Sequence, residues 1–82
     1  MNFDGATFDQ KRDGARLAAQ LTRVRNLMLD GEWRTLFDIH FATGDPLQSV
    51  SARLRDLRKE RFGSYTVERQ RIGGGLFAYR VI

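Results

Sequence analysis

Polar and basic side chains recur at helical spacing between residues 46 and 61. If Val50, Leu54 and Leu57 are turned inward on a helical wheel of about 100° per residue, these side chains occupy the opposite face and its edges. Short residues come first on that face and longer basic residues follow, a pattern that suits entry into the major groove of DNA. The candidate DNA contacts are Gln48, Ser49, Ser51, Ala52, Arg53, Arg55, Arg58 and Lys59.

Each polar residue type on this face has a defined chemistry toward DNA. The Gln48 amide can pair with adenine, and the planar Arg55 guanidinium can donate two hydrogen bonds to guanine. The hydroxyls of Ser49 and Ser51 can bond a phosphate or a base edge. The competing interpretation is an ordinary solvated helix face, because the basic residues alternate with acidic ones.

A second basic cluster lies near the C-terminus. Arg69 and Arg71 precede the run Gly73–Gly75, which is typical of the turn of a β-hairpin. Arginines near the end of a hairpin can reach the minor groove or the phosphate backbone. The glycines do not form a nucleotide-binding loop, because no lysine and Ser/Thr follow them and no helix begins there. The alternative is that the glycines only supply a turn.

The first element predicted to support these side chains is a helix that begins after Asp13 and ends before Gly31. Asp13 can cap its start, and a glycine is a common residue just past a helix end. The apolar face of this helix is formed by Leu17, Leu21, Val24 and Met28. Residues 1–12 show no period, and we interpret them as an N-terminal arm preceding a single domain of residues 13–82.

A short bridging strand over residues 32–34 and a second helix are predicted next. Thr35 and Asp38 have the spacing of a capping box, in which each residue satisfies a backbone N–H of the other. Gly44 ends this helix. Trp33, at the centre of the bridging strand, is expected in the core with its N–H bonded to a backbone carbonyl.

The third helix follows almost without a break. Asp45 is expected to be its N-cap and Pro46 its first residue, so that the helix runs over 46–61 and stops at Gly63. Two helices separated by so short a connection must cross sharply, which is typical of a helix-turn-helix.

The C-terminal residues 64–82 are predicted to form a basic β-hairpin, because 65–71 and 76–82 alternate with period two. The side chains expected on the core face are Val67, Phe77, Tyr79 and Val81. Those expected toward solvent are Glu68, Ala78 and Arg80. The predicted order is α-β-α-α-β-β, a mainly α fold with a small hairpin (α+β), which is the order of a winged helix-turn-helix domain.

Three segments carry a family resemblance: TGDPLQSVSARLRDLRKERFG, the preceding DGARLAAQLTRVRNLMLDGEWRTL and the closing GGGLFAYRVI. They resemble a family of small winged-helix proteins of bacteriophages and prophages. The resemblance covers nearly the whole chain and implies a winged-helix fold and DNA binding. One departure is His40, which stands where the family tends to have alanine.

The second helix has an unusual surface. Phe37 and Phe41 are four residues apart on a helix face that is expected to be exposed to solvent. Either the arm covers them through Phe3 or Phe8, or they form an exposed patch for a protein partner or a dimer. His40 is expected to be a packed imidazole with one satisfied nitrogen, and the alternative is a lone metal ligand.

Composition narrows the function classes. The chain has 82 residues, one histidine and no cysteine, so no thiolate metal site, disulfide, catalytic constellation or cofactor site is expected. Residues 1–46 carry six Lys/Arg against seven Asp/Glu, whereas residues 47–82 carry eight against three. A basic half makes a polyanion the first partner to consider.

The leading hypothesis is therefore a non-enzymatic module that binds double-stranded DNA, as a phage-encoded transcriptional regulator or architectural protein in the bacterial cytoplasm, associated with the nucleoid. The alternative is a protein-interaction module that docks a host or viral protein through Phe37 and Phe41. A homodimer is possible under either hypothesis. Neither a membrane nor a small-molecule substrate is expected. The sequence does not indicate which DNA sequence is bound or whether transcription is activated or repressed. It also does not indicate whether RNA or a DNA junction is bound in place of a DNA duplex.

Overall fold

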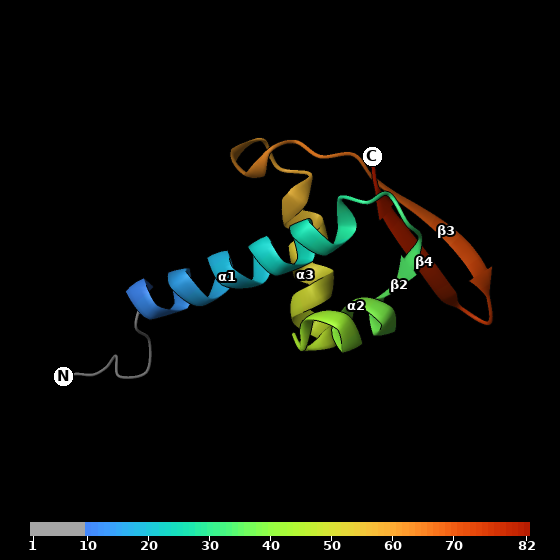
Figure 1. Ribbon diagram of the computed structural model, residues 1–82, viewed down its shortest axis with the longest axis horizontal. Helices are drawn as coiled ribbons and strands as arrows, with labels where there is room; N and C mark the ends of the chain where they lie inside the picture. The colour runs from blue at the N-terminus through green and yellow to red at the C-terminus, as the bar shows by residue number, and fades with distance from the viewer. Residues whose placement is uncertain (1–9) are drawn as a thin grey trace.

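The computed structural model describes residues 10–82 of the chain, with side chains from residue 14 onward. The described residues form three α-helices and a three-stranded antiparallel sheet (Figure 1). The elements follow one another along the chain in the order α1, β2, α2, α3, β3 and β4, with a short 3-10 helix, η1, between α3 and β3. This α+β architecture is consistent with a winged-helix-like layout. None of the described helices has the length and apolar character needed to cross a membrane.

Helix α1 (Gln10–Met28) begins before the residue predicted to cap it. Asp13 lies inside the helix, so the predicted N-cap there was wrong. The predicted end is confirmed, because the Gly31 N–H bonds the Met28 carbonyl and Gly31 has a φ of +78°, which favours glycine. Residues 1–9, which make up most of the predicted arm, lie outside the described residues.

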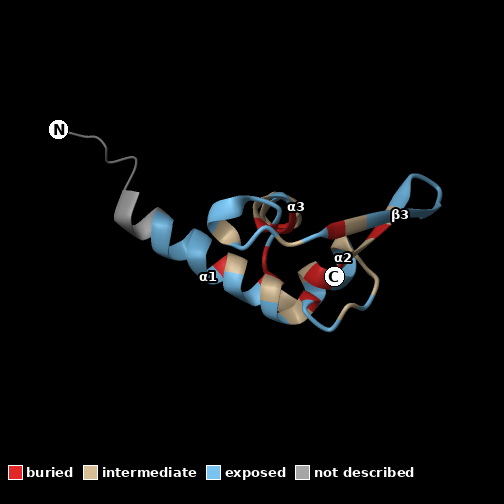
Figure 2. Cartoon of the chain, turned by 90° about the horizontal axis from the view of Figure 1, so that it is seen from above, coloured by how far each residue is buried: buried red, intermediate tan, exposed pale blue. Residues whose placement is uncertain are grey.

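Only the second half of α1 reaches the core. Val24 and Met28 are fully buried, but Leu17 is 45% exposed, so its predicted place in the buried face was wrong. The reason is the position of α3, which crosses α1 beyond its middle (Figure 1). The buried apolar residues gather where the helices and the start of the hairpin meet (Figure 2): Val24, Met28, Ile39, Val50, Leu54, Leu57, Val67 and Val81.

Helix α2 (Leu36–Thr43) forms as predicted. The Asp38 N–H donates to Thr35 Oγ1 at 3.1 Å, and the Thr35 N–H donates to Asp38 Oδ2 at 3.0 Å, which completes the capping box. At the other end Gly44 adopts a φ of +78° and donates to the His40 carbonyl. These local bonds satisfy backbone groups that the helix leaves free.

Helix α3 (Leu47–Leu57) differs from the prediction at both ends. Pro46 is its N-cap, and Asp45 makes no cap bond but turns inward to Arg23. The helix ends at Leu57 instead of residue 61, and η1 (Glu60–Phe62) follows. A longer helix would have turned Arg61 toward the core, and burying an unpaired guanidinium is costly.

The hairpin consists of β3 (Val67–Gly73) and β4 (Leu76–Val81), and β2 (Arg34–Thr35) pairs with the outer side of β4. The predicted glycine turn is confirmed, with Gly74 and Gly75 at φ +56° and +76°, as in two-residue hairpin turns. The pairing shifts between Arg71 and Gly73, which makes Ile72 an extra residue in a bulge.

Three predictions about the sheet were wrong. The bridging strand consists of Arg34–Thr35 instead of residues 32–34. Ala78 is 5% exposed instead of facing solvent, because β4 is the central strand and the partners of Ala78, Thr35 and Gln70, flank so small a side chain. Trp33 precedes β2 and is half-buried, outside the buried core, with the Arg80 guanidinium 4.7 Å from its ring centroid.

Candidate nucleic-acid interface

The strand register determines where the hairpin arginines point. In the antiparallel pair, Arg69 lies opposite Tyr79 and Arg71 opposite Phe77. Directly opposed residues share a face of the sheet, and Val67 with Val81 places that face against the core. Arg69 and Arg71 therefore project on the side of the sheet that the helices cover. Because this end of the hairpin extends beyond the helices, both remain exposed (Figure 2).

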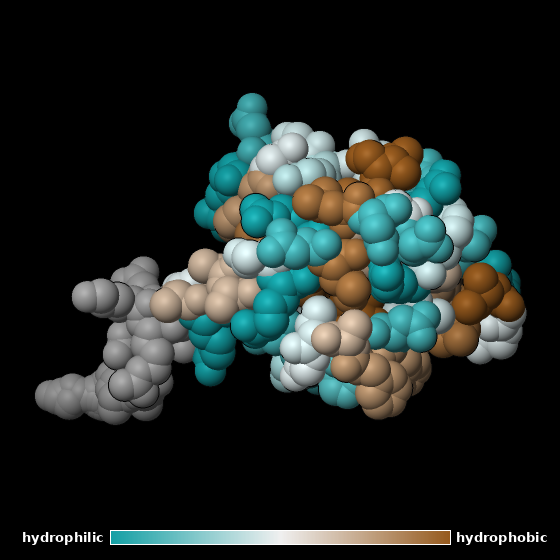
Figure 3. Space-filling view, in the orientation of Figure 1, coloured by the Kyte–Doolittle hydropathy of each residue, from teal (hydrophilic) through white to brown (hydrophobic). Residues whose placement is uncertain are grey.

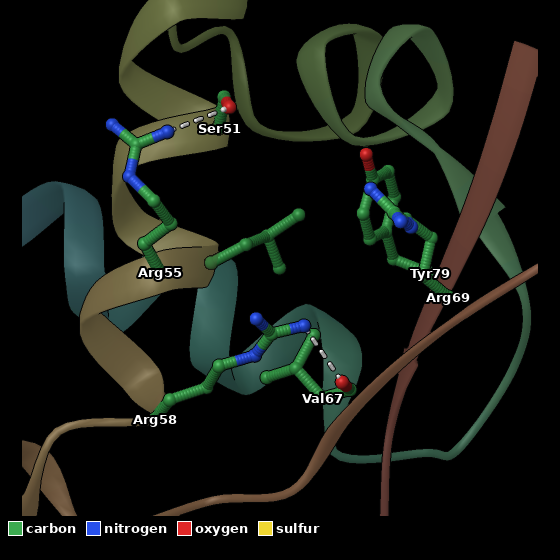
Figure 4. Close-up of a pocket in the computed structure, with 7 residues that line it drawn as sticks. Ser51, Arg55, Arg58, Val67, Arg69 and Tyr79 are labelled. Carbon is green, nitrogen blue, oxygen red and sulfur yellow. Dashed lines mark hydrogen bonds between the residues drawn. The ribbon is translucent and has the colours of Figure 1, made fainter.

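A groove of about 360 Å³ lies between α3 and the hairpin. Figure 4 shows Ser51, Arg55 and Arg58 on its α3 side, with Arg69 and Tyr79 facing them from the hairpin. The groove thus brings together the two basic clusters that the sequence predicted separately. Its complete lining is Ser51, Leu54, Arg55, Arg58, Val67, Arg69 and Tyr79, and we refer to it as the arginine groove.

Arg58 connects the two walls of the arginine groove. It follows α3 directly, and its Nη2 donates to the Val67 carbonyl at 2.9 Å (Figure 4). This bond uses one of five guanidinium donors, so others remain for a ligand. Arg58 therefore holds the start of the hairpin near the end of α3 while its charge stays at the groove.

Three arginines near the groove are not neutralised by a carboxylate among the described residues: Arg55, Arg69 and Arg71. Within residues 14–82 none of the three pairs with a carboxylate. Arg55 Nη1 makes only a long contact of 3.4 Å with Ser51 Oγ. The Arg69 guanidinium lies 4.6 Å from the Phe77 ring centroid, an arrangement that supports the side chain without neutralising it. Exposed, unneutralised guanidinium groups suit phosphate and base edges.

Arg53 has a different environment from the one predicted. Its side chain is 11% exposed, and it donates to Asp56 Oδ2 and to Gln20 Oε1, each at 2.9 Å. The second bond joins α3 to α1 and satisfies an amide that is itself buried. We therefore leave Arg53 out of the proposed interface.

Lys59 is also held within the protein, although it is 54% exposed. Its Nζ lies 3.0 Å from Asp56 Oδ1. Burial acts to raise the pKa of Asp56, but the Lys59 hydrogen bond and the charges of Arg53 and Lys59 outweigh it, so the pKa is lowered. Asp56 thus stays ionised and offsets part of the positive charge at this edge of α3.

The remaining predicted contacts lie at the start and middle of α3. Gln48 is exposed, whereas Ser49, Ser51 and Ala52 are half-buried. Ser51 lines the arginine groove, and the other three do not. The N-terminal turn of α3 therefore presents one long polar side chain, that of Gln48.

His40 is packed as predicted. Its Nδ1 lies 2.6 Å from the Asp45 carbonyl oxygen. A carbonyl oxygen only accepts hydrogen bonds, so Nδ1 carries the proton and Asp45 is its acceptor. The bond joins the end of α2 to the residue before Pro46. It thereby helps to hold the sharp connection that sets the direction of α3.

The two phenylalanines of α2 are exposed, Phe37 by 49% and Phe41 by 78%. Phe37 lines a smaller groove of about 120 Å³ together with Leu76 and Phe77 of the hairpin. Apolar side chains are visible over α2 and at the far end of the hairpin in Figure 3. Phe3 and Phe8, which were suggested as cover for them, lie outside the described residues.

Sequence reasoning missed the parts that support the arginine groove. Tyr79 lies on the core face as predicted and packs against the core, but its half-buried side chain also forms a wall of the groove, and Phe77 supports Arg69. The signal was present in the alternation of the two strands. Once the register is known, Arg69, Phe77 and Tyr79 must share a face.

No family model, curated protein or solved structure matches this chain. The functional interpretation therefore depends on the geometry of the arginine groove and on the charges around it.

Proposed function

We propose that this chain is a non-enzymatic DNA-binding module of the winged helix-turn-helix type. In this proposal α3 enters the major groove, and the hairpin contacts the phosphate backbone or the minor groove beside it. The observation that carries the proposal is the arginine groove, which Arg55, Arg58 and Arg69 line from two sides with no carboxylate partner among the described residues.

The distribution of charge supports the same partner. The half of the chain that builds the groove, residues 47–82, carries eight Lys/Arg and three Asp/Glu. Those acidic residues do not lie in the groove lining, and Asp56 and Glu68 are bound to other basic side chains. The groove therefore offers a polyanion positive charge that needs no internal ion pair to be broken.

The biological role follows from the resemblance to small winged-helix proteins of bacteriophages and prophages. We propose a transcriptional regulator or an architectural DNA-binding protein that acts in the bacterial cytoplasm, at the nucleoid. Base contacts by Gln48 and Arg55 would give sequence preference, whereas Arg69 and Arg71 would give affinity that is common to all sequences.

The direct test is titration of a fluorescent DNA duplex with the protein at several salt concentrations. Each phosphate neutralised contributes about −0.9 to the slope of log affinity against log salt. With Arg55, Arg58, Arg69 and Arg71 as the available charges, we expect a slope of about −2 to −4. Absence of binding, or an affinity that salt does not change, would contradict the proposal.

A second candidate function is protein docking through α2, which the exposure of Phe41 favours. A partner would cover Phe41 and Phe37, and the basic residues would serve solubility alone. A complex that survives nuclease treatment and is lost in Phe41→Glu, together with unchanged behaviour of Arg55→Ala, would support docking over DNA binding.

A further inference from the structure

The first turns of α1 leave the protein body with an apolar side uncovered. Residues 14–19 are all exposed, and the first buried residue along the helix is Gln20, at 6%. In Figure 1 this part of α1 extends away from α2, α3 and the sheet. A helical segment that buries so little gains little stability from packing, and a glycine such as Gly14 weakens it further.

A mainly apolar groove of about 240 Å³ runs along this side, between α1 and η1, with the charged side chains of Asp56 and Arg61 in its opposite wall. Its α1 residues, Gly14, Leu17, Ala18 and Leu21, have the spacing i, i+3, i+4 and i+7. Four residues at this spacing form the hole that accepts one side chain of a neighbouring helix in knobs-into-holes packing. The hole is open at its Gly14 corner, where an added Cβ would meet nothing within 4 Å.

The same surface also offers the side chain that such a hole accepts. Leu17 lies within the four-residue set and is 45% exposed. In a two-fold interface the same patch of both copies is in contact, so the patch must contain both the hole and the side chain that fills the hole of the other copy. Here Leu17 lies near the middle of the interval 14–21. Two antiparallel α1 helices could therefore exchange their Leu17 side chains without any shift along the helix.

We propose that a second copy of this chain occupies the groove, through antiparallel packing of the two α1 helices about a two-fold axis. Phe62 of η1, which forms the other apolar wall, would cover the side of the contact. The groove shares no lining residue with the arginine groove, so the contact itself does not use the residues proposed to bind DNA. Because a single pair of helices is a small interface, we expect a reversible dimer with a dissociation constant on the order of micromolar.

Cysteine cross-linking tests the geometry, since the natural chain has no cysteine. Ala18 and Ala19 are adjacent and both exposed, but Ala18 lines the groove and Ala19 lies about 100° further round the helix. We expect Ala18→Cys to form a disulfide-linked dimer under mild oxidation and Ala19→Cys to remain largely monomeric. Equal cross-linking of the two variants, or none in Ala18→Cys, would overturn the proposal.

Sedimentation of the 82-residue chain without DNA tests the association itself. We expect the wild type to dimerise with rising concentration and Leu17→Glu to associate about a hundredfold or more weakly, because a two-fold interface contains the substitution twice. Phe41→Glu, at an exposed residue of α2, should dimerise like the wild type. A wild type that stays monomeric, or a dimer lost in Phe41→Glu and kept in Leu17→Glu, would overturn the proposal.

The two tests also separate this proposal from DNA binding. Neither measurement contains DNA, so the dimer can be shown or excluded whether or not the arginine groove binds a duplex. If Leu17→Glu failed to fold by circular dichroism, the cysteine pair would decide the question, because both substitutions replace an exposed alanine.

Discussion

On one face of the hairpin, Arg80 donates to Glu68 Oε1 at 2.6 Å and lies 4.7 Å from the Trp33 ring centroid. On the other face, Arg69 lies on the Phe77 ring and, like Arg71, has no carboxylate partner within residues 14–82. All three residues are arginines, and all three belong to the same pair of strands, β3 and β4. What differs is the neighbour across the strand pair, a glutamate for Arg80 and an aromatic residue for Arg69 and Arg71.

The same contrast divides α3. Arg53 is bound to Asp56 and Gln20 on the side that faces α1, whereas Arg55, two residues later, faces the arginine groove. A run of arginines in a sequence can thus contain both structural and ligand-binding members. The presence or absence of a fixed partner separates the two, and the following experiments test that separation.

The largest effect is expected on DNA affinity. Arg55→Ala, Arg69→Ala and Arg71→Ala should each weaken binding by about tenfold or more, and only Arg55→Ala should relax sequence preference. Arg80→Ala removes the same charge from the opposite face and should change affinity by about twofold at most. Fluorescence anisotropy with matched duplexes measures both quantities. An Arg80→Ala effect as large as that of Arg69→Ala would mean that total charge, and not its position, determines binding.

The next effect is expected on stability. Arg53→Ala leaves the Gln20 oxygen and Asp56 without a donor, and should lower the free energy of unfolding by about 1–3 kcal/mol. Arg55→Ala should change it by no more than about 0.5 kcal/mol, because Arg55 is exposed and the one bond of its side chain within residues 14–82 is the long contact with Ser51. Urea denaturation of the two variants measures the difference. Equal losses would contradict the division of α3.

A smaller effect is expected from the paired face of the hairpin. Arg80 and Glu68 have side chains 36% and 39% exposed, so solvent screens their attraction. Arg80→Ala should therefore cost about 1 kcal/mol or less, including its contact with Trp33. A double-mutant cycle with Glu68→Gln isolates the ion pair, and a coupling energy well above that value would show that the hairpin depends on it.

The smallest effect concerns acid stability. Hydrogen bonds from Arg34 and the Glu32 N–H lower the pKa of Asp30 from 3.8 to about 2. A carboxyl with a lowered folded-state pKa stabilises the protein above its unfolded pKa, and this contribution disappears as the pH falls from about 4 toward 2. Melting temperatures of wild type and Asp30→Asn should therefore differ near neutral pH and converge near pH 2. A constant difference over that range would show that Asp30 acts through something other than its charge.

Much of the local structure could be predicted from neighbouring residues. The Thr35 and Asp38 capping box, the stop at Gly44 and the glycine turn of the hairpin all formed as expected. Each depends on residues within three or four positions of one another, so the chain carries all the partners in a short segment. The basic clusters of the arginine groove were predicted for the same reason, since helical and strand periods assign side chains to faces.

The tertiary structure decided which charges are used internally. Asp45 was expected to cap α3, but Arg23 lies close enough to bind it. Arg53 was expected at the interface, but Gln20 meets it from another helix. These partners are far apart along the chain, so no local period indicates them. Only the packing of α1 against α3 brings them within hydrogen-bonding distance, and burial then favours pairing because an unpaired charge away from water is costly.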